Sequence, residues 1–157
     1  AGPKLIEYNV RFGDPECQVL MRRLDEDLLP LLRDVAAGAL VDRPLAWSAD
    51  AAACVVLAAD GYPGAYEKGS TVRGVDAAEA LPGVVVFHAG TRRDGAALRA
   101  AGGRVLNVTA VGASLEEALA RAYAGVDAVD WPAGFHRRDI GWRAAGGPAP
   151  RPAAGAL

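Results

Sequence analysis

The sequence predicts an α+β fold in which a mixed or mainly antiparallel sheet is covered by a capping helix. Strand-like runs follow one another along the chain instead of alternating with helices, which is not the order of a doubly wound parallel sheet. Hydrophobic residues make up 52% of the 157 residues, so the chain can bury a sizeable core. These observations favour one domain, or one domain with a piece of another.

Residues 4–10 alternate with the period of two that is typical of a strand. Glu7 and Asn9 fall on one face, which Arg11 continues. The opposite face carries Ile6, Tyr8 and Val10. We therefore expect a strand here, with a row of polar side chains along one side.

A helix is predicted to follow the turn at Gly13. Asp14 is a suitable N-cap residue, Pro15 suits the first helical position, and Glu16 follows it. The carboxylate of Glu16 also suits the N-terminal end of a helix dipole.

A second helical segment is predicted over residues 25–37. It ends at Gly38, a residue that suits the C′ position. Pro30 lies inside this segment, where it either kinks the helix or marks its true first turn.

A second unit begins near Trp47, and its strand-like runs are expected to form the sheet. The runs cover residues 51–59, 71–75, 84–88 and 104–111. Ser114 and Glu117 then form a capping box in front of an apolar stripe with helical spacing, so the clearest helix is predicted there.

The residues after this helix are expected to contribute packing and little else. Trp131 and Trp142 are interpreted as packing aromatics, and His136 as a surface residue. Residues 144–157 are rich in Ala, Gly, Pro and Arg, so we expect them to form a disordered tail.

Composition and charge exclude several classes of function. The formal net charge is −2, so no single-sign field attracts nucleic acid or a membrane surface. No apolar stretch approaches the roughly 20 residues of a membrane span. The two cysteines, Cys17 and Cys54, form no metal-type pair, and a reduced thiol is expected for both. We expect a soluble cytoplasmic protein without nucleic-acid or membrane partners.

One constellation carries chemistry. Glu7, Asn9 and Arg11 would rise in a row along the predicted strand, with steps of roughly 6.6–6.8 Å. A carboxylate and an amide oxygen suit Mg²⁺, and a neighbouring guanidinium can hold a phosphoryl or carboxylate oxygen. The spacing alone leaves another interpretation open, in which this face is only the solvated side of an edge strand.

The same residues resemble a known family. Residues 2–16 read Gly-Pro-Lys-Leu-Ile-Glu-Tyr-Asn-Val-Arg-Phe-Gly-Asp-Pro-Glu, which is similar to the last catalytic strand of the phosphoribosylamine–glycine ligases. The Glu-x-Asn-x-Arg core is shared with the wider ATP-grasp superfamily. Further blocks resemble this family in its order along the chain, at residues 58–64 with 66–69, 87–91, 102–109 and 137–143. The resemblance covers nearly the whole chain as far as Arg143.

The resemblance implies a domain division and a reaction. Residues 1–45 would be the C-terminal end of an ATP-grasp catalytic domain, residues 46–143 the ligase's C-terminal domain, and residues 144–157 the tail. The complete enzyme would join glycine to 5-phosphoribosylamine in purine biosynthesis, using ATP and Mg²⁺ or Mn²⁺. Glycyl phosphate would be the intermediate, and glycinamide ribonucleotide, ADP and phosphate the products.

The resemblance also implies roles for the polar row. Glu7 and Asn9 would bind the metal ion that bridges the ATP phosphates, and Arg11 would stabilise charge on the transferring phosphoryl group. Asp14 and Glu16 are candidates for substrate binding, with a structural role at the helix start as the alternative.

Three further residues are candidates for substrate binding in the C-terminal blocks. Lys68 follows a glycine-rich loop that can approach a ribose phosphate, although such a loop is more often a tight turn. His88 ends a strand, and a structural role is the alternative. Arg104 begins a strand, from which it can reach substrate or pair with a carboxylate. Gly102 and Gly103 before it would let another backbone come close.

The family's N-terminal and ATP-grasp portions would precede residue 1. We therefore expect this chain to be a C-terminal portion whose main partner is the rest of the same polypeptide. Alone, it is expected to bind ATP weakly and to be inactive. Two alternatives remain. A different ATP-grasp ligase should lack the sequence Arg-Phe-Gly-Asp-Pro-Glu, and a non-catalytic assembly module would keep the blocks without the reaction.

Overall fold

The computed structural model describes residues 2–146. Its main sheet has the strand order β3 (Val84–His88), β6 (Arg104–Gly112), β1 (Ala51–Ala59) and β7 (Gly134–Phe135), and each neighbouring pair is antiparallel. A smaller antiparallel sheet has the order β2 (Thr71–Val72), β5 (Ala97–Ala100) and β4 (Thr91–Asp94). The α+β prediction with antiparallel strands is confirmed.

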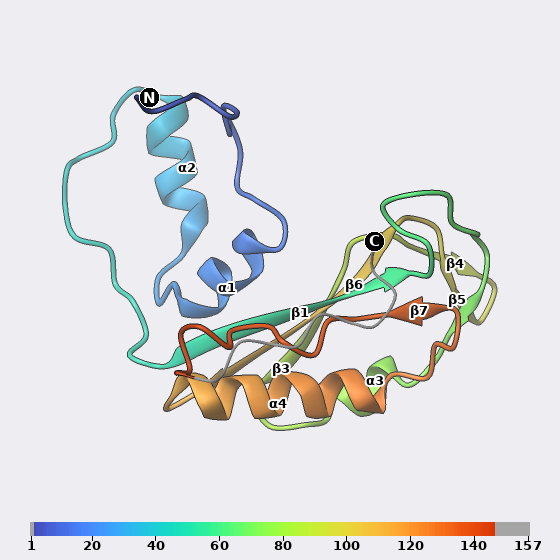
Figure 1. Ribbon diagram of the computed structural model, residues 1–157. Coiled ribbons are helices and arrows are strands. Elements are labelled where there is room, and N and C mark those ends of the chain that lie inside the picture. The colour runs from blue at the N-terminus through green and yellow to red at the C-terminus, as the bar shows by residue number, and fades with distance from the viewer. Residues whose placement is uncertain (1, 147–157) are drawn as a thin grey trace.

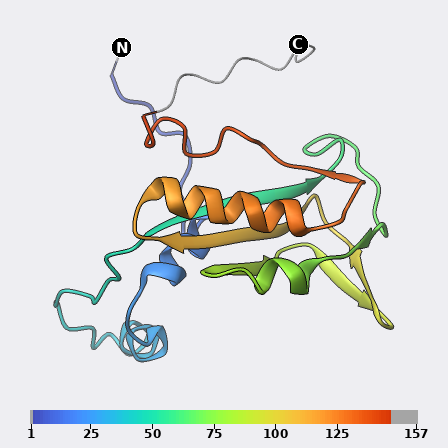
Figure 2. The same cartoon turned by 90° about the horizontal axis from the view of Figure 1, so that it is seen from below.

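The long helix α4 (Leu115–Ala128) covers one face of the main sheet, beside the short α3 (Val75–Glu79), and α1 (Glu16–Arg23) lies on the other side (Figure 1). Figure 2 shows α4 running along the sheet in the second view. The helix α2 (Leu28–Ala36) stands beyond α1, away from the sheet. The described part of the chain contains no helix with the length and apolar character needed to cross a membrane.

The core lies between α4 and the sheet. Val55 faces Val108, and Leu57 faces Leu106, across the β1–β6 pair, and these four side chains are at most 5% exposed. Small residues on α4 allow the helix to approach closely, since Ala118, Ala122 and Gly125 are buried against them. Burial of this apolar layer is the main stabilising contribution.

The predicted strands β1, β3 and β6 form within one residue of their expected bounds. The helix after Ser114 also forms, and the Ser114 hydroxyl accepts a hydrogen bond from the Glu117 amide at 3.2 Å. The reciprocal bond differs from the standard capping box, because the Glu117 carboxylate accepts from the amide of Ala113, one residue before the cap.

The second helical segment is shorter than residues 25–37. Asp27 caps α2 by accepting from the Leu29 amide at 2.9 Å, so Pro30 belongs to the first turn, where its missing N–H is harmless. At the other end Gly38 has a φ of +65°. Its amide donates to the carbonyl of Val35, which is one bond of a Schellman motif.

Two elements of the smaller sheet differ from the prediction. The run over residues 71–75 is only the two-residue strand β2, and Val75 already begins α3. The β4–β5 hairpin was not predicted. Its first strand is rich in charge (Thr-Arg-Arg-Asp) and has no apolar alternation, because this strand lies mainly in solvent.

The predicted strand over residues 4–10 is not formed. A strand needs a neighbour to bind its backbone N–H and C=O groups, and no strand of the described chain lies beside this segment. Its apolar side chains are correspondingly exposed, with Ile6 at 95% and Val10 at 92%. The predicted tail begins at residue 144; residues 144–146 form a turn, and the rest of the tail lies outside the described residues.

Candidate functional site

The polar row predicted from the sequence lies in an exposed segment. Among the described residues, no backbone–backbone hydrogen bond involves residues 2–12. The Arg11 guanidinium donates to the Asn9 side-chain oxygen and, at 3.3 Å, to the carbonyl of Phe12. Asn9 and Arg11 are therefore brought together, and all three residues of the row, Glu7 included, are exposed.

The donors of this segment fit part of a magnesium shell. Glu7 supplies a carboxylate and Asn9 an amide oxygen, which are hard oxygen ligands of the kind Mg²⁺ prefers. Within residues 2–146 no group of three or more His, Cys, Asp or Glu side chains is placed to hold a metal ion. A metal ion bound here would therefore take its remaining ligands from water, phosphate or another part of a larger protein.

The segment joins the folded domain at Asp14, which is half-buried against β6. Arg104 on β6 binds Asp14 twice, with Nε 3.2 Å from Oδ2 and Nη1 donating to the backbone carbonyl at 2.9 Å. The Asn107 amide nitrogen donates to Oδ1 at 3.2 Å, and Gln18 on α1 donates to the same oxygen at 2.8 Å. Asp14 and Arg104, both predicted as site residues, are thus brought into direct contact.

Asp14 is not the N-cap of α1. The cap position is Pro15, which has no side-chain cap, and Asp14 lies one residue further out. The carboxylate of Asp14 instead accepts from Gln18 and from the sheet. The Asp14 carboxylate is stabilised more by a guanidinium and two side-chain amide donors than by capping the helix, because a carboxylate gains most from charge-assisted hydrogen bonds.

A β-bulge lets Arg104 and Asn107 reach the same carboxylate. In an unbroken strand, residues three apart point to opposite faces of the sheet. The register of β1 against β6 shifts, since Leu57 pairs with Leu106 but Ala58 pairs with Arg104. The extra residue, Val105, turns Arg104 onto the face of Asn107, which is the usual effect of a bulge.

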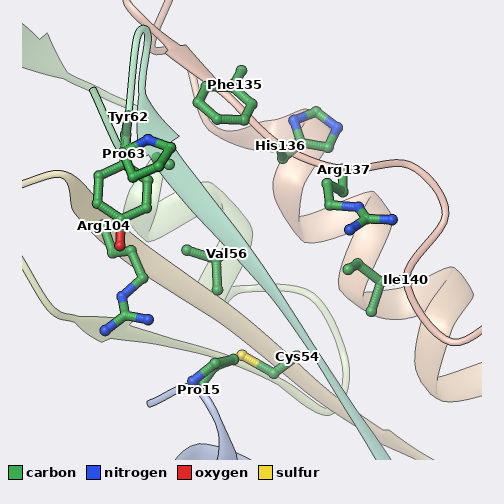
Figure 3. A pocket seen from close by; sticks show the side chains of 11 residues that line it. Pro15, Cys54, Val56, Tyr62, Pro63, Arg104, Phe135, His136, Arg137 and Ile140 are labelled. Atoms are coloured by element: carbon green, nitrogen blue, oxygen red, sulfur yellow. The ribbon is translucent and has the colours of Figure 1, made fainter. Parts of the chain in front are cut away.

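A pocket of about 480 Å³ opens on this same face of the sheet. Figure 3 shows Pro15 beside Cys54 at one end of the pocket and Phe135 at the other, with Tyr62 and Arg104 along one side. Gly103, the residue before β6, allows the Tyr62 ring to come close to the backbone, because a Cβ at this position would be 2.2 Å from Cδ2 of that ring. Most of the other lining residues are apolar, so the pocket is mainly apolar although Arg104, His136 and Arg137 lie at it.

The cations at the pocket are already paired. Arg137 donates through Nε to Oδ1 of Asp139 at 2.7 Å, and this contact raises the pKa of Arg137 and lowers the pKa of Asp139. Arg104 is bound to Asp14. The pocket therefore presents an apolar surface with neutralised charge at its edge, which suits a weakly polar group better than a free dianion.

His136 is half-buried at the pocket, and its interpretation as a surface residue is wrong. Its Nε2 is buried without a hydrogen-bond partner among the described residues. Burial lowers the pKa of His136, and the positive charge of Arg138 lowers it further. No local sequence pattern indicates that His136 is partly buried, because its burial depends on the chain folding back over β1.

Cys54 lies at the other end of the pocket. Burial raises the pKa of its thiol to about 11, and the neighbouring Thr109 side chain acts in the opposite direction. The thiol is therefore protonated at neutral pH and unreactive. The prediction of a reduced thiol is consistent with the structure, in which both cysteines are free.

The remaining predicted site residues do not line this pocket. Glu16 begins α1 and is exposed; Lys68 is exposed, with Nζ 5.9 Å from the centre of the Tyr66 ring. His88 ends β3, and its Nδ1 is 2.9 Å from the Thr91 hydroxyl. The close approach predicted for the glycine pair does occur, since a Cβ at Gly90 would be 2.8 Å from Cα of Gly102.

Four of the five sequence blocks named above contribute to this pocket. Pro15 comes from the first block, Tyr62 from the second, Arg104 from the fourth and Ile140 from the last. The block over residues 87–91 lies instead at the far end of β3. The pocket and the Asp14 contacts are therefore the place where most of the distinctive sequence meets.

Comparison with known proteins agrees with this. Residues 52–143 match the family described as phosphoribosylglycinamide synthetase, C domain. The phosphoribosylamine–glycine ligase of Mesorhizobium japonicum is 62% identical over 143 residues, which are 91% of this chain and 33% of that protein. The chloroplastic phosphoribosylamine–glycine ligase of Arabidopsis thaliana is 58% identical over 144 residues, which are 90% of this chain and 27% of that protein.

A solved structure shows the same fold. The crystal structure of the phosphoribosylamine–glycine ligase of Thermotoga maritima superposes with a TM-score of 0.72 at 35% identity, covering 87% of this chain and 33% of that one. The chain spans about a third of the length of the relatives it matches. On the match over residues 52–143, the chain belongs to the phosphoribosylglycinamide synthetase C-domain family.

Proposed function

We propose that the chain is the C-terminal portion of a ligase that joins glycine to 5-phosphoribosylamine with ATP. The observation that carries the proposal is the Glu-Tyr-Asn-Val-Arg segment, which leads directly into a turn that β6 binds through Asp14. A relative that bears this activity in its name is 62% identical over 143 residues, which are 91% of the chain.

The reaction has two steps. A carboxylate oxygen of glycine attacks the γ-phosphorus of ATP, and the bond to the β,γ-bridging oxygen breaks, which gives glycyl phosphate and ADP. The amine of phosphoribosylamine then attacks the acyl carbon and expels phosphate, leaving glycinamide ribonucleotide after the amine loses a proton. The first step is a phosphoryl transfer, in which positioning and charge neutralisation supply most of the catalysis.

The exposed polar row supplies groups suited to this first step. Glu7 and Asn9 are the proposed ligands of a Mg²⁺ or Mn²⁺ ion, which would neutralise charge on the ATP phosphates. Arg11 is the proposed partner of the transferring phosphoryl group or the acyl phosphate, since a guanidinium can bind such oxygens in a bidentate manner. Lys68, His88 and Glu16 remain candidates for substrate binding, on the resemblance alone.

The rest of the same polypeptide is the proposed partner of residues 2–47. Most of the large apolar side chains that are exposed in the described structure lie in this stretch. They are Leu5, Ile6, Tyr8, Val10, Phe12, Leu20, Leu29, Leu32, Val35, Leu40, Val41, Leu45 and Trp47. So much exposed apolar surface in one stretch indicates an interface. We therefore assign residues 1–45 to the end of an ATP-grasp domain and residues 46–143 to the C-terminal domain.

We place the enzyme in the cytoplasm. The plant relative is named as chloroplastic, so that placement is proposed for this chain and not for all of its relatives. The substrates are small molecules, and nothing in the charge balance of −2 favours a nucleic-acid partner.

Turnover by the full-length gene product tests the proposal. Release of ADP should require both glycine and phosphoribosylamine, and Glu7→Gln should lower kcat by at least about 100-fold, because it removes the anionic metal ligand. Glu67→Gln is a matched control, since Glu67 is an exposed carboxylate outside the polar row. Absence of glycine-dependent ADP release in the full-length protein would refute the proposal and favour a non-catalytic assembly module.

A further inference from the structure

Asp14 is where the proposed catalytic segment is attached to the rest of the molecule. Before it, residues 2–12 are exposed and make no backbone–backbone hydrogen bond within the described structure. After it, Cys17 donates to the carbonyl of Gly13, and α1 begins. The direction in which the segment leaves the domain is therefore set at Asp14.

The groups that hold Asp14 come from the most constrained part of the fold. β6 lies between β3 and β1 in the main sheet, and Asn107 is fully buried in it. Arg104 binds both the carboxylate and the backbone carbonyl of Asp14, which fixes the peptide itself and not only its side chain. Two contacts on one residue from a rigid strand define its orientation more closely than a single surface ion pair does.

The bulge at Val105 allows Arg104 and Asn107 to bind the same residue, Asp14. It turns Arg104 onto the face of Asn107, so that both side chains meet one carboxylate. Bulges are enriched next to active sites, where they redirect a side chain. A packed strand without the bulge would direct Arg104 toward the α4 face, away from Asp14.

We propose that Arg104 and Asn107 are positioning residues of the ligase, which act on the proposed catalytic row by fixing Asp14. The inference rests on the proposed function. Arg11 lies three residues from Asp14, within about 10 Å of the anchor, whereas Glu7 lies seven residues away and can be up to about 24 Å from it. Loss of the anchor therefore displaces Arg11 more directly than Glu7.

The expected kinetic effect follows from this difference in distance. A misplacement of about 1 Å at a reacting centre can lower a rate about 100-fold. Arg104→Met in the full-length enzyme should lower kcat by about 10- to 100-fold and change the KM for Mg–ATP by less than about 3-fold. Arg104→Lys keeps the charge but loses the two-pronged contact, so it should fall between Arg104→Met and the wild type.

Arg138→Met provides the matched control. Arg138 is paired with Asp127 on α4 at 3.0 Å and, like Arg104, is a partly exposed arginine in an ion pair with an aspartate. It does not contact Asp14. Both Met variants should keep the melting temperature of the enzyme within about 4 °C of wild type, because exposed pairs contribute little to stability. Only Arg104→Met should lower kcat.

Two further measurements separate positioning from other roles. In a double-mutant cycle, Arg104→Met should have a smaller effect in an Asp14→Ala background than in the wild type, since Asp14→Ala already removes the side-chain part of the contact and leaves only the backbone carbonyl. Amide hydrogen exchange of residues 7–12 in the full-length protein should be faster in Arg104→Met than in Arg138→Met.

Equal kcat in the wild type and Arg104→Met, or additive effects of the Arg104 and Asp14 changes, would overturn the inference. Exchange of residues 7–12 that does not change in Arg104→Met would overturn it as well. An inactive wild-type enzyme would refute the proposed function and the kinetic part of this inference, whereas the exchange rates would still decide whether Arg104 orders the segment.

Discussion

Replacement of Gly125 by Ala tests how tightly α4 is packed on the sheet. Gly125 is buried in α4, and a Cβ at this position would lie 2.8 Å from Cγ1 of Val108 and 3.0 Å from Cγ1 of Val84. Ordinary contacts of this kind are 3.4–4 Å. Both valines are at most 5% exposed, so neither side chain has free space to move into. The helix would have to move outward.

Two opposing effects decide the outcome. Ala is better than Gly in a helix by up to about 1 kcal/mol. Overpacking of a filled core costs about 1–3 kcal/mol, because the added methyl forces side chains off their rotamers and shifts the backbone. The packing term is larger, so we expect Gly125→Ala to lower the free energy of unfolding by about 1 kcal/mol. The melting temperature should fall by about 2–4 °C.

Urea unfolding of this chain, followed by circular dichroism, measures the difference. Ala120→Gly is the control, because Ala120 is exposed on the same helix and reports the helix-propensity effect without a packing contribution. It should lower stability by up to about 1 kcal/mol. If Gly125→Ala instead raises stability by the amount that Ala120→Gly lowers it, propensity alone decides the result and the packing argument is refuted.

Other predictions concern the pocket and the chain as a whole. Burial lowers the pKa of His136, so the unfolded state binds a proton at a higher pH than the folded state does. At pH values under about 6.5, the free energy of unfolding of the wild type should therefore decrease more than that of His136→Gln. Parallel pH profiles of the two proteins would contradict this. The pKa of Cys54 is raised to about 11, so iodoacetamide at pH 8 should label Cys54 only after unfolding, as mass spectrometry of its peptide can show. Trp131→Phe removes a 2.9 Å hydrogen bond from the buried indole ring to the Ser70 hydroxyl. It should lower the free energy of unfolding, measured in urea, by about 1–3 kcal/mol. An unchanged urea midpoint would mean that this bond contributes nothing. Calorimetry should find Mg–ATP binding to this chain alone at least about 100-fold weaker than to the full-length ligase, since most of a convergent site would lie outside it.

The sequence was most informative where apolar pattern and burial coincide. The run Ala51–Ala59 is apolar throughout, the run from Arg104 to Gly112 is mainly apolar, and the two pair with each other, so local pattern and tertiary context agree. Ser114 with Glu117 predicted the start of α4 for the same reason, because capping depends on neighbours close in the sequence. The distinctive blocks also identified the family that residues 52–143 match.

Features that depend on distant residues could not be predicted. The alternation over residues 4–10 predicts a strand only when another strand lies beside it, and the described chain provides none. The bulge at Val105 leaves no mark in the composition of β6, because Val suits either face of a buried strand. Asp14 and Arg104 were both candidates for substrate binding, but their contact spans 90 positions of sequence and has no local signal.

The two faces of the main sheet have different chemistry, and this difference accounts for the role proposed for the domain. The face under α4 is closed by Val55, Val108 and Leu106, which leave no polar group in need of a partner. The opposite face carries Asn107 and Thr109, both fully buried, and the side-chain oxygen of each has no hydrogen-bond partner in the described structure. Buried polar groups lower stability when they are only partly satisfied, so a domain selected for stability alone would replace them with apolar residues. Asn107 instead binds Asp14, the residue from which the proposed catalytic segment departs. This role best explains why a polar side chain that lowers the stability of the fold is present in the sheet.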